Sequence, residues 1–105
     1  MTNNKNKLLD IGMNLTRIGN WITDDYTTKK KRIRIFFNQT SNDLHSLDDK
    51  VMPTKQSRNA LKRFKQEYPL IESSVLNSSS PNIILAEKMF TWGNILTHKA
   101  ALIKN

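Results

Sequence analysis

Two short segments rich in lysine and arginine hold the side chains best suited to binding chemistry. Five cations stand at Lys29, Lys30, Lys31, Arg32 and Arg34, and five more at Lys55, Arg58, Lys62, Arg63 and Lys65. These are ten of the seventeen cations in a chain of 105 residues with a formal net charge of +8. Ammonium and guanidinium groups attract and hydrogen-bond carboxylates and phosphates. The pattern predicts an anionic partner.

The first basic segment stands where a helix is expected to begin. Cations in a first helical turn oppose the helix dipole, so folding alone does not explain this position. Ile35 falls about 160° around the helix from the apolar stripe, beside Lys31 and Asn38, which predicts an exposed hydrophobic residue within a charged patch. The alternative is that the cations only solvate an exposed face.

The second basic segment predicts a ridge on one helix. Lys55, Arg58, Lys62 and Lys65 lie within about 80° of one another at helical spacing. No carboxylate intervenes before Glu67. Such a ridge could neutralise a phosphate backbone. If the two basic helices run antiparallel, Arg34 and Lys65 are expected at neighbouring heights, so that the two groups merge into one surface.

Catalytic and metal-binding patterns are missing from the sequence. His45 and Asp49 stand four residues apart, which on a helix favours a surface ion pair over a catalytic base, because no nucleophile or further ligand accompanies them. His98 is expected to complement the dipole at a helix end. The chain has no cysteine. We therefore expect a protein that is not an enzyme and has no metal or cofactor.

Four helices are expected, because apolar residues recur at steps of three and four in four segments. The stripes are Leu8, Ile11, Leu15, Ile18 and Ile22; Ile33, Phe37, Thr40, Leu44, Leu47 and Val51; Leu61, Phe64, Tyr68, Ile71 and Val75; and Leu85, Met89, Trp92, Leu96 and Ile103. Thr40 is expected to bond back to the preceding turn. The prediction is an all-α, up-and-down antiparallel four-helix bundle with helices at about 5–23, 27–50, 54–77 and 81–103. A three-helix core with the fourth helix given to a partner is the alternative.

Proline and serine mark two boundaries in this scheme. Pro69 is expected to kink the helix at 54–77 or to divide it in two, because proline cannot donate a backbone hydrogen bond. Ser80 and Pro81 form a start signal for the last helix, with serine as the cap and proline in the first turn.

Glycines and a second apolar row suggest places where another helix could approach. Gly12 and Gly19 lie seven residues apart at the edge of their stripe. Either they reflect sequence drift, or they mark a close helix contact inside the bundle or with a second subunit. Ile84, Ile95 and Leu102 form a row about 90° from the main stripe of the last helix. That row belongs either to the core or to an oligomer interface, and these five residues are the candidate interface. We expect a homo-oligomer.

The length and the N-terminal sequence predict the domain organisation and the location of the protein. The length suits a single helical domain spanning residues 1–105. No apolar run approaches the roughly 20 residues that span a bilayer, and no secretory leader is visible, so the cytoplasm is the default location. The expected function is that of a basic interaction or adaptor protein that binds an acidic protein surface or other polyanion through Lys29 to Arg34, Ile35 and the ridge from Lys55 to Lys65. The alternative is an accessory protein that binds RNA or DNA by shape and charge, although no RNA-binding or DNA-binding motif accompanies the cations.

Overall fold

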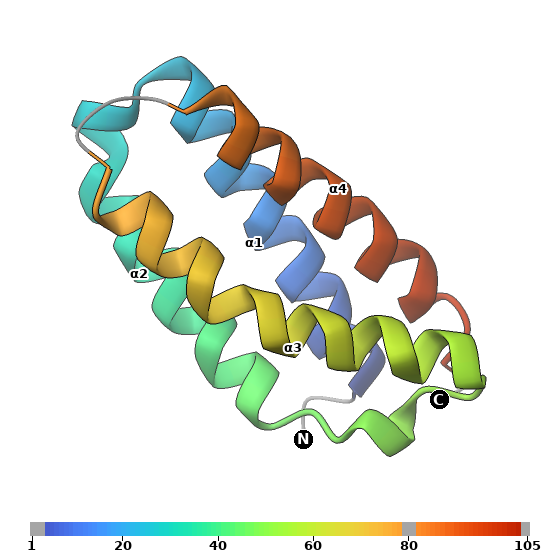
Figure 1. The fold of residues 1–105 in the computed structure, drawn as a ribbon. Helices are drawn as coiled ribbons and strands as arrows, with labels where there is room; N and C mark the ends of the chain where they lie inside the picture. The colour runs from blue at the N-terminus through green and yellow to red at the C-terminus, as the bar shows by residue number, and fades with distance from the viewer. Residues whose placement is uncertain (1–3, 79–81, 104–105) are drawn as a thin grey trace.

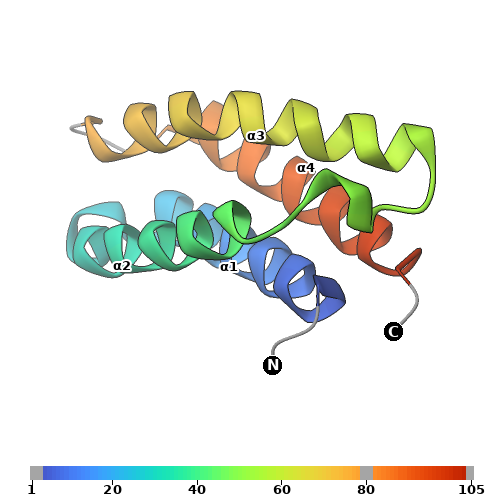
Figure 2. The ribbon, with the colours of Figure 1, turned by 90° about the horizontal axis from the view of Figure 1, so that it is seen from below.

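The computed structural model describes residues 4–78 and 82–103, and these form an antiparallel helical bundle. Its elements are α1 (Asn4–Asp24), α2 (Tyr26–His45), the short 3-10 helix η1 (Asp49–Val51), α3 (Lys55–Leu76) and α4 (Ile83–Ala100). The four long helices run alternately up and down, and α1 packs against both α2 and α4 (Figures 1 and 2). No strand occurs within the described ranges. The predicted four-helix bundle is confirmed.

The core consists largely of the predicted apolar stripes. Every stripe residue of α1 is buried, and so is every stripe residue of α3. In α2 the polar member Thr40 is fully buried, and its hydroxyl donates to the carbonyl of Phe36 at 2.8 Å, as expected. Val51 and Leu85 are only partly buried and pack against the edge of the core.

The residues at the helix contacts set the spacing of the bundle. Small residues bring α1 and α4 together, because a Cβ atom built on Gly12 would lie 3.1 Å from the carbonyl oxygen of Gly93. Aromatic rings fill the space around α3. The ring centroids of Phe37 and Tyr68 are 6.0 Å apart, and those of Phe64 and Trp92 are 5.2 Å apart. Bulky rings therefore separate α3 from its neighbours, whereas glycines allow close contact between α1 and α4.

The predicted end of the second helix is wrong, because α2 ends at His45 and not near residue 50. Short polar side chains compete with the helix here. The hydroxyl of Ser46 donates to the carbonyl of Asp43 at 2.9 Å, and the carboxylate of Asp48 accepts from the amide of Lys50 at 2.9 Å. Leu47 remains buried as predicted, although it follows the helix.

The helix α3 continues through Pro69 without a break. It begins at a capping box in which the hydroxyl of Thr54 accepts from the amide of Ser57 at 3.0 Å, and the hydroxyl of Ser57 accepts from the amide of Thr54 at 3.1 Å. Pro69 is exposed, and it has no amide hydrogen to donate to the carbonyl of Lys65. The ribbon of α3 changes direction between its green and orange halves (Figure 1).

The last helix is shorter at both ends than predicted. The proposed start signal at Ser80 and Pro81 lies outside the described residues. Asn82 caps α4 instead, because its side-chain oxygen accepts from the amide of Leu85 at 3.2 Å. The helix ends at Ala100, yet Ile103 still reaches the core through the turn that follows.

Candidate functional site

The cations near the start of α2 are mostly solvent-exposed. Lys30, Lys31, Arg32 and Arg34 are exposed, and Lys29 is half-buried. None of these five pairs with a carboxylate in the described part of the chain, where the single ion pair joins Arg63 and Glu67 at 3.4 Å. Ile35 is 46% exposed, as its position opposite the apolar stripe predicted.

Part of the basic segment lies beside the carbonyl end of α3. The hydroxyl of Tyr26 donates to the carbonyl of Val75 at 2.6 Å and lies 2.9 Å from that of Ser78. Lys30 places its ammonium 5.8 Å from the centre of the Tyr26 ring. Burial raises the pKa of Tyr26, and the charge of Arg34 acts in the opposite direction. Tyr26 therefore joins the start of α2 to the carbonyl end of α3.

The predicted ridge on α3 is not a row of equivalent exposed cations. Arg58 donates from Nη1 to the carbonyl of Met52 at 3.0 Å, and Lys65 donates from Nζ to the carbonyl of Leu47 at 2.6 Å. Both side chains are half-buried and hold the connection between α2 and α3. Lys55, Lys62 and Arg63 remain exposed, and Arg63 carries the ion pair to Glu67.

The two basic groups do not merge, and the expectation that Arg34 and Lys65 lie at neighbouring heights is wrong. Tyr68 donates its hydroxyl hydrogen to the carbonyl of Phe37 at 2.8 Å, whereas the Lys65 side chain extends away from Arg34 to the carbonyl of Leu47. Arg34 comes three residues before Phe37 and Lys65 three residues before Tyr68, so in antiparallel helices they lie on opposite sides of this level, about 9 Å apart along the axis. Because α2 and α3 are antiparallel, the first turns of the two helices lie at opposite ends of the bundle (Figure 1).

The glycines of the predicted interface face the inside of the bundle. A Cβ atom on Gly12 would lie 2.5 Å from the hydroxyl of Thr97, and one on Gly19 would lie 2.7 Å from the ring of Phe90. Both neighbours belong to α4, so the close contact is intramolecular. The apolar row on α4 is different, since Ile84 is 67% exposed and Leu102 is 42% exposed, while Ile95 is half-buried.

A polar cleft between α1 and α2 was not predicted. It has a volume of about 420 Å³ and is lined by Asp10, Asn14, Arg17, Gln39, Asn42 and Asp43. Burial raises the pKa of the Asp43 carboxyl, Asp10 raises it further, and Lys7 lowers it. The spacing of Asp10, Asn14 and Arg17 on one helix face is visible in the sequence, but nothing local identifies the facing residues of α2.

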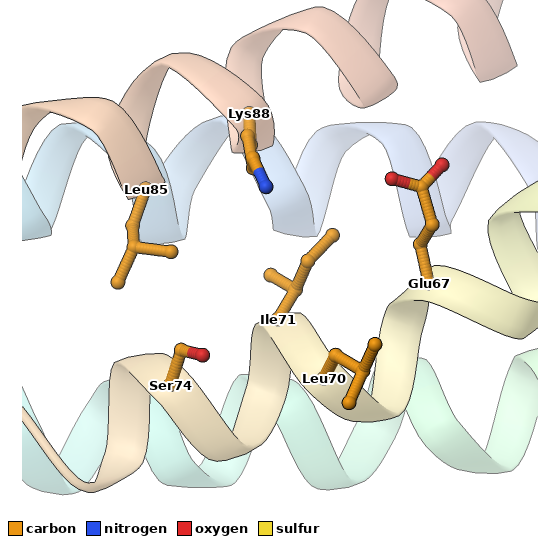
Figure 3. Close-up of a pocket in the computed structure, with 6 residues that line it drawn as sticks. All are labelled: Glu67, Leu70, Ile71, Ser74, Leu85 and Lys88. Carbon is orange, nitrogen blue, oxygen red and sulfur yellow. The ribbon is translucent and has the colours of Figure 1, made fainter.

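A second cleft, of about 90 Å³, lies between α3 and α4, and sequence reasoning missed it too. Its walls are Glu67, Leu70, Ile71, Ser74, Leu85 and Lys88 (Figure 3). Leu70 is 71% exposed, the largest exposed fraction among the large apolar residues described. The Oε2 atom of Glu67 is covered by protein and accepts no hydrogen bond from the described residues.

Titratable side chains elsewhere have structural roles. The Tyr68 hydroxyl lies 3.0 Å from that of Ser41 and 3.3 Å from the carboxylate of Glu72. Burial raises the pKa of Tyr68 well above its ordinary value, so at neutral pH this hydroxyl keeps its proton and joins α2 to α3. His98 Nδ1 lies 2.9 Å from the carbonyl of Asn94.

His45 and Asp49 were predicted to pair on one face of a helix. They do not share a helix, because α2 ends at His45. The Asp49 side chain is outside the described part. Within the described ranges, no three histidine, aspartate or glutamate side chains gather closely enough to hold a metal ion.

No family model, no curated protein and no solved structure matches this chain. Among the described residues, no helix combines the length and apolar character needed to cross a membrane.

Proposed function

We propose that this chain is a basic interaction module that binds an acidic protein surface through the outward face of α2. The observation that carries the proposal is the exposure of Lys31 and Arg32 beside Ile35, without an ion pair to any described carboxylate. Lys30 and Arg34 flank this face on the side of α3. These residues replace the broader predicted surface, since Arg58 and Lys65 are engaged with backbone carbonyls of their own chain.

Ile35 favours a protein partner over nucleic acid. A phosphate backbone is bound by charge, and an exposed aliphatic side chain contributes little to that interaction. At a protein interface, a central apolar contact surrounded by charged residues is the usual arrangement. The amides of Asn38, Gln39 and Asn42 continue the same exposed surface of α2. They can donate hydrogen bonds to carboxylates without adding charge.

A pair of matched charge reversals tests the proposal. Lys31→Glu with Arg32→Glu changes the α2 surface, whereas Lys55→Glu with Lys62→Glu makes the same change of net charge at the opposite end of the bundle. Each pair lowers the formal charge by four, from +8 to +4. All four side chains are exposed, so both variants should keep the helical circular dichroism spectrum.

The measurement is affinity capture from the source cells, with and without nuclease, followed by titration of the purified captured protein. We expect the α2 reversal to weaken that complex tenfold or more, about 1.4 kcal/mol, and the α3 reversal to change it far less. Ile35→Ser should weaken it with no change in charge. Equal losses from the two reversals would indicate generic charge attraction and overturn the proposal. Capture that disappears with nuclease would instead establish the nucleic-acid alternative.

A further inference from the structure

The outer seam between α3 and α4 has an apolar surface that the bundle itself does not cover. Leu70 of α3 and Ile84 of α4 are 71% and 67% exposed. Leu70 lines the 90 Å³ cleft together with Ile71 and Leu85, and Ile84 adjoins Leu85 in sequence. Ile84 also stands one helical turn before Lys88, which lines the cleft. Apolar side chains gathered at a cleft, unlike single scattered ones, mark an interaction surface.

A carboxylate and an ammonium group stand at the same cleft. Glu67 Oε2 is covered, and its neighbour Arg63 approaches only as an ion pair, with Nε at 3.4 Å. That oxygen is closed to a partner, whereas the rest of the Glu67 side chain is 36% exposed and open to one. Figure 3 shows Glu67 and Lys88 extending from different helices over the cleft floor formed by Ile71. No ion pair joins Glu67 to Lys88 in the described structure.

We propose that a second copy of this chain docks on the α3–α4 seam through a two-fold axis. A two-fold interface brings the same patch of both copies together, so a residue that contacts another is contacted by it in return. A patch that carries both a carboxylate and an ammonium group is complementary to itself in this arrangement. Lys88 of each copy then pairs with the Glu67 carboxylate of the other, whose side chain is 36% exposed. Leu70 and Ile84 are buried between the two ion pairs.

The charge distribution permits this contact despite the net charge of +8. The basic start of α2 is separated from the seam by α3, and in Figure 2 α3 and α4 lie above α1 and α2. Of the residues predicted for an oligomer interface, the seam includes Ile84. It excludes Gly12 and Gly19, which face α4 within one chain. The α2 surface stays exposed in such a dimer, so this inference does not depend on the proposed function.

Sedimentation velocity over a wide concentration series at physiological ionic strength tests the seam. We expect a reversible dimer, and we expect Leu70→Glu with Ile84→Glu to raise its dissociation constant at least tenfold. Met13→Glu is the matched control, because Met13 is 49% exposed on α1 and lies away from the seam. A monomeric wild-type protein, or an equal effect of Met13→Glu, would overturn the proposal.

Charge exchange gives a second test that loss of folding cannot imitate. Glu67→Lys alone and Lys88→Glu alone should each weaken the dimer, because like charges then face each other twice. Mixing the two variants should restore dimers to near wild-type strength, since each contact again joins opposite charges. If the mixture stays as weak as its components, Glu67 and Lys88 do not meet across the interface and the two-fold seam is wrong.

Discussion

At the scale of single residues, the two glycines of α1 differ in what an added methyl group would meet. On Gly12 the methyl would approach the Thr97 hydroxyl and the backbone carbonyl of Gly93, and a carbonyl moves only if the helix moves. On Gly19 it would meet the ring of Phe90, a half-buried side chain that can rotate. The same substitution therefore tests how rigid the α1–α4 contact is at each position.

Gly12→Ala should destabilise the protein by about 1–3 kcal/mol through overpacking. This exceeds the roughly 1 kcal/mol that alanine gains over glycine in a helix. Gly19→Ala should be near neutral, because the gain in helix propensity offsets the movement of Phe90. Urea unfolding of both variants measures the difference. A stabilising Gly12→Ala would mean that α1 and α4 are farther apart than described.

The raised pKa of Asp43 predicts a dependence of stability on pH. The folded state holds this proton more tightly than the unfolded state, whose carboxyl titrates near the ordinary value of 3.8. The favourable contribution is therefore complete below that pH, and it is lost as the pH rises through the folded pKa. Asp43→Asn should raise the melting temperature at neutral pH more than in acid.

Thermal unfolding of Asp43→Asn and wild type at the two pH values measures this effect. Asp10→Asn is the companion variant, because it removes the repulsion on Asp43 and should also stabilise at neutral pH. If Asp43→Asn instead destabilises most at neutral pH, the attraction of Lys7 outweighs burial and the charge of Asp10.

At the scale of elements, α3 combines a strong start with a costly interior residue. The capping box at Thr54 and Ser57 satisfies backbone donors in the first turn, whereas Pro69 has no amide hydrogen for the carbonyl of Lys65. The apolar stripe nevertheless continues past Pro69, and both Ile71 and Val75 are buried. Burial of these residues holds the second half of α3 in the bundle.

Pro69→Ala should stabilise the protein by about 1–3 kcal/mol, because alanine restores the helical hydrogen bond at an exposed position. Urea unfolding measures the change, with Gln66→Ala as the control on the same helix. Gln66 is exposed, and its replacement should matter by no more than about 0.5 kcal/mol. Destabilisation by Pro69→Ala would show that the bend at this proline is needed to seat Ile71 and Val75.

At the scale of the whole molecule, charge is poorly balanced. The net charge is +8, and the one ion pair within the described ranges is at the surface, where such pairs contribute little. Folding brings the cations at the start of α2 close together, and self-repulsion then opposes the compact state. Dissolved salt screens charges over about 10 Å at 0.1 M.

The melting temperature should therefore rise with sodium chloride from very low to physiological ionic strength. The Lys31→Glu and Arg32→Glu variant, with a net charge of +4, should show a smaller rise. Differential scanning calorimetry of both proteins in the same salt series measures the contrast. A melting temperature that falls with salt would mean that attractive pairs outweigh the repulsion.

The sequence alone determined which side chains enter the core and which surface of α2 stays exposed. Burial of a helical residue follows from its angular position, so Leu15, Phe37 and Phe64 were predictable, and so was the exposure of Lys31 and Ile35. Helix ends were less predictable. Polar side chains such as Ser46 and Asp48 compete locally with the helix, and their choice depends on what the next segment packs against.

Only the tertiary structure decided which residues from different helices lie together. The pairing of Phe37 with Tyr68 sets the level of α3 against α2, and it offsets Arg34 from Lys65, which the sequence predicted at neighbouring heights. It also brings Lys65 to the carbonyl of Leu47 and faces the glycines of α1 toward α4. A helical period is a local property of the chain, whereas these contacts join residues far apart in sequence, and packing of complementary side chains selects among the possible alignments.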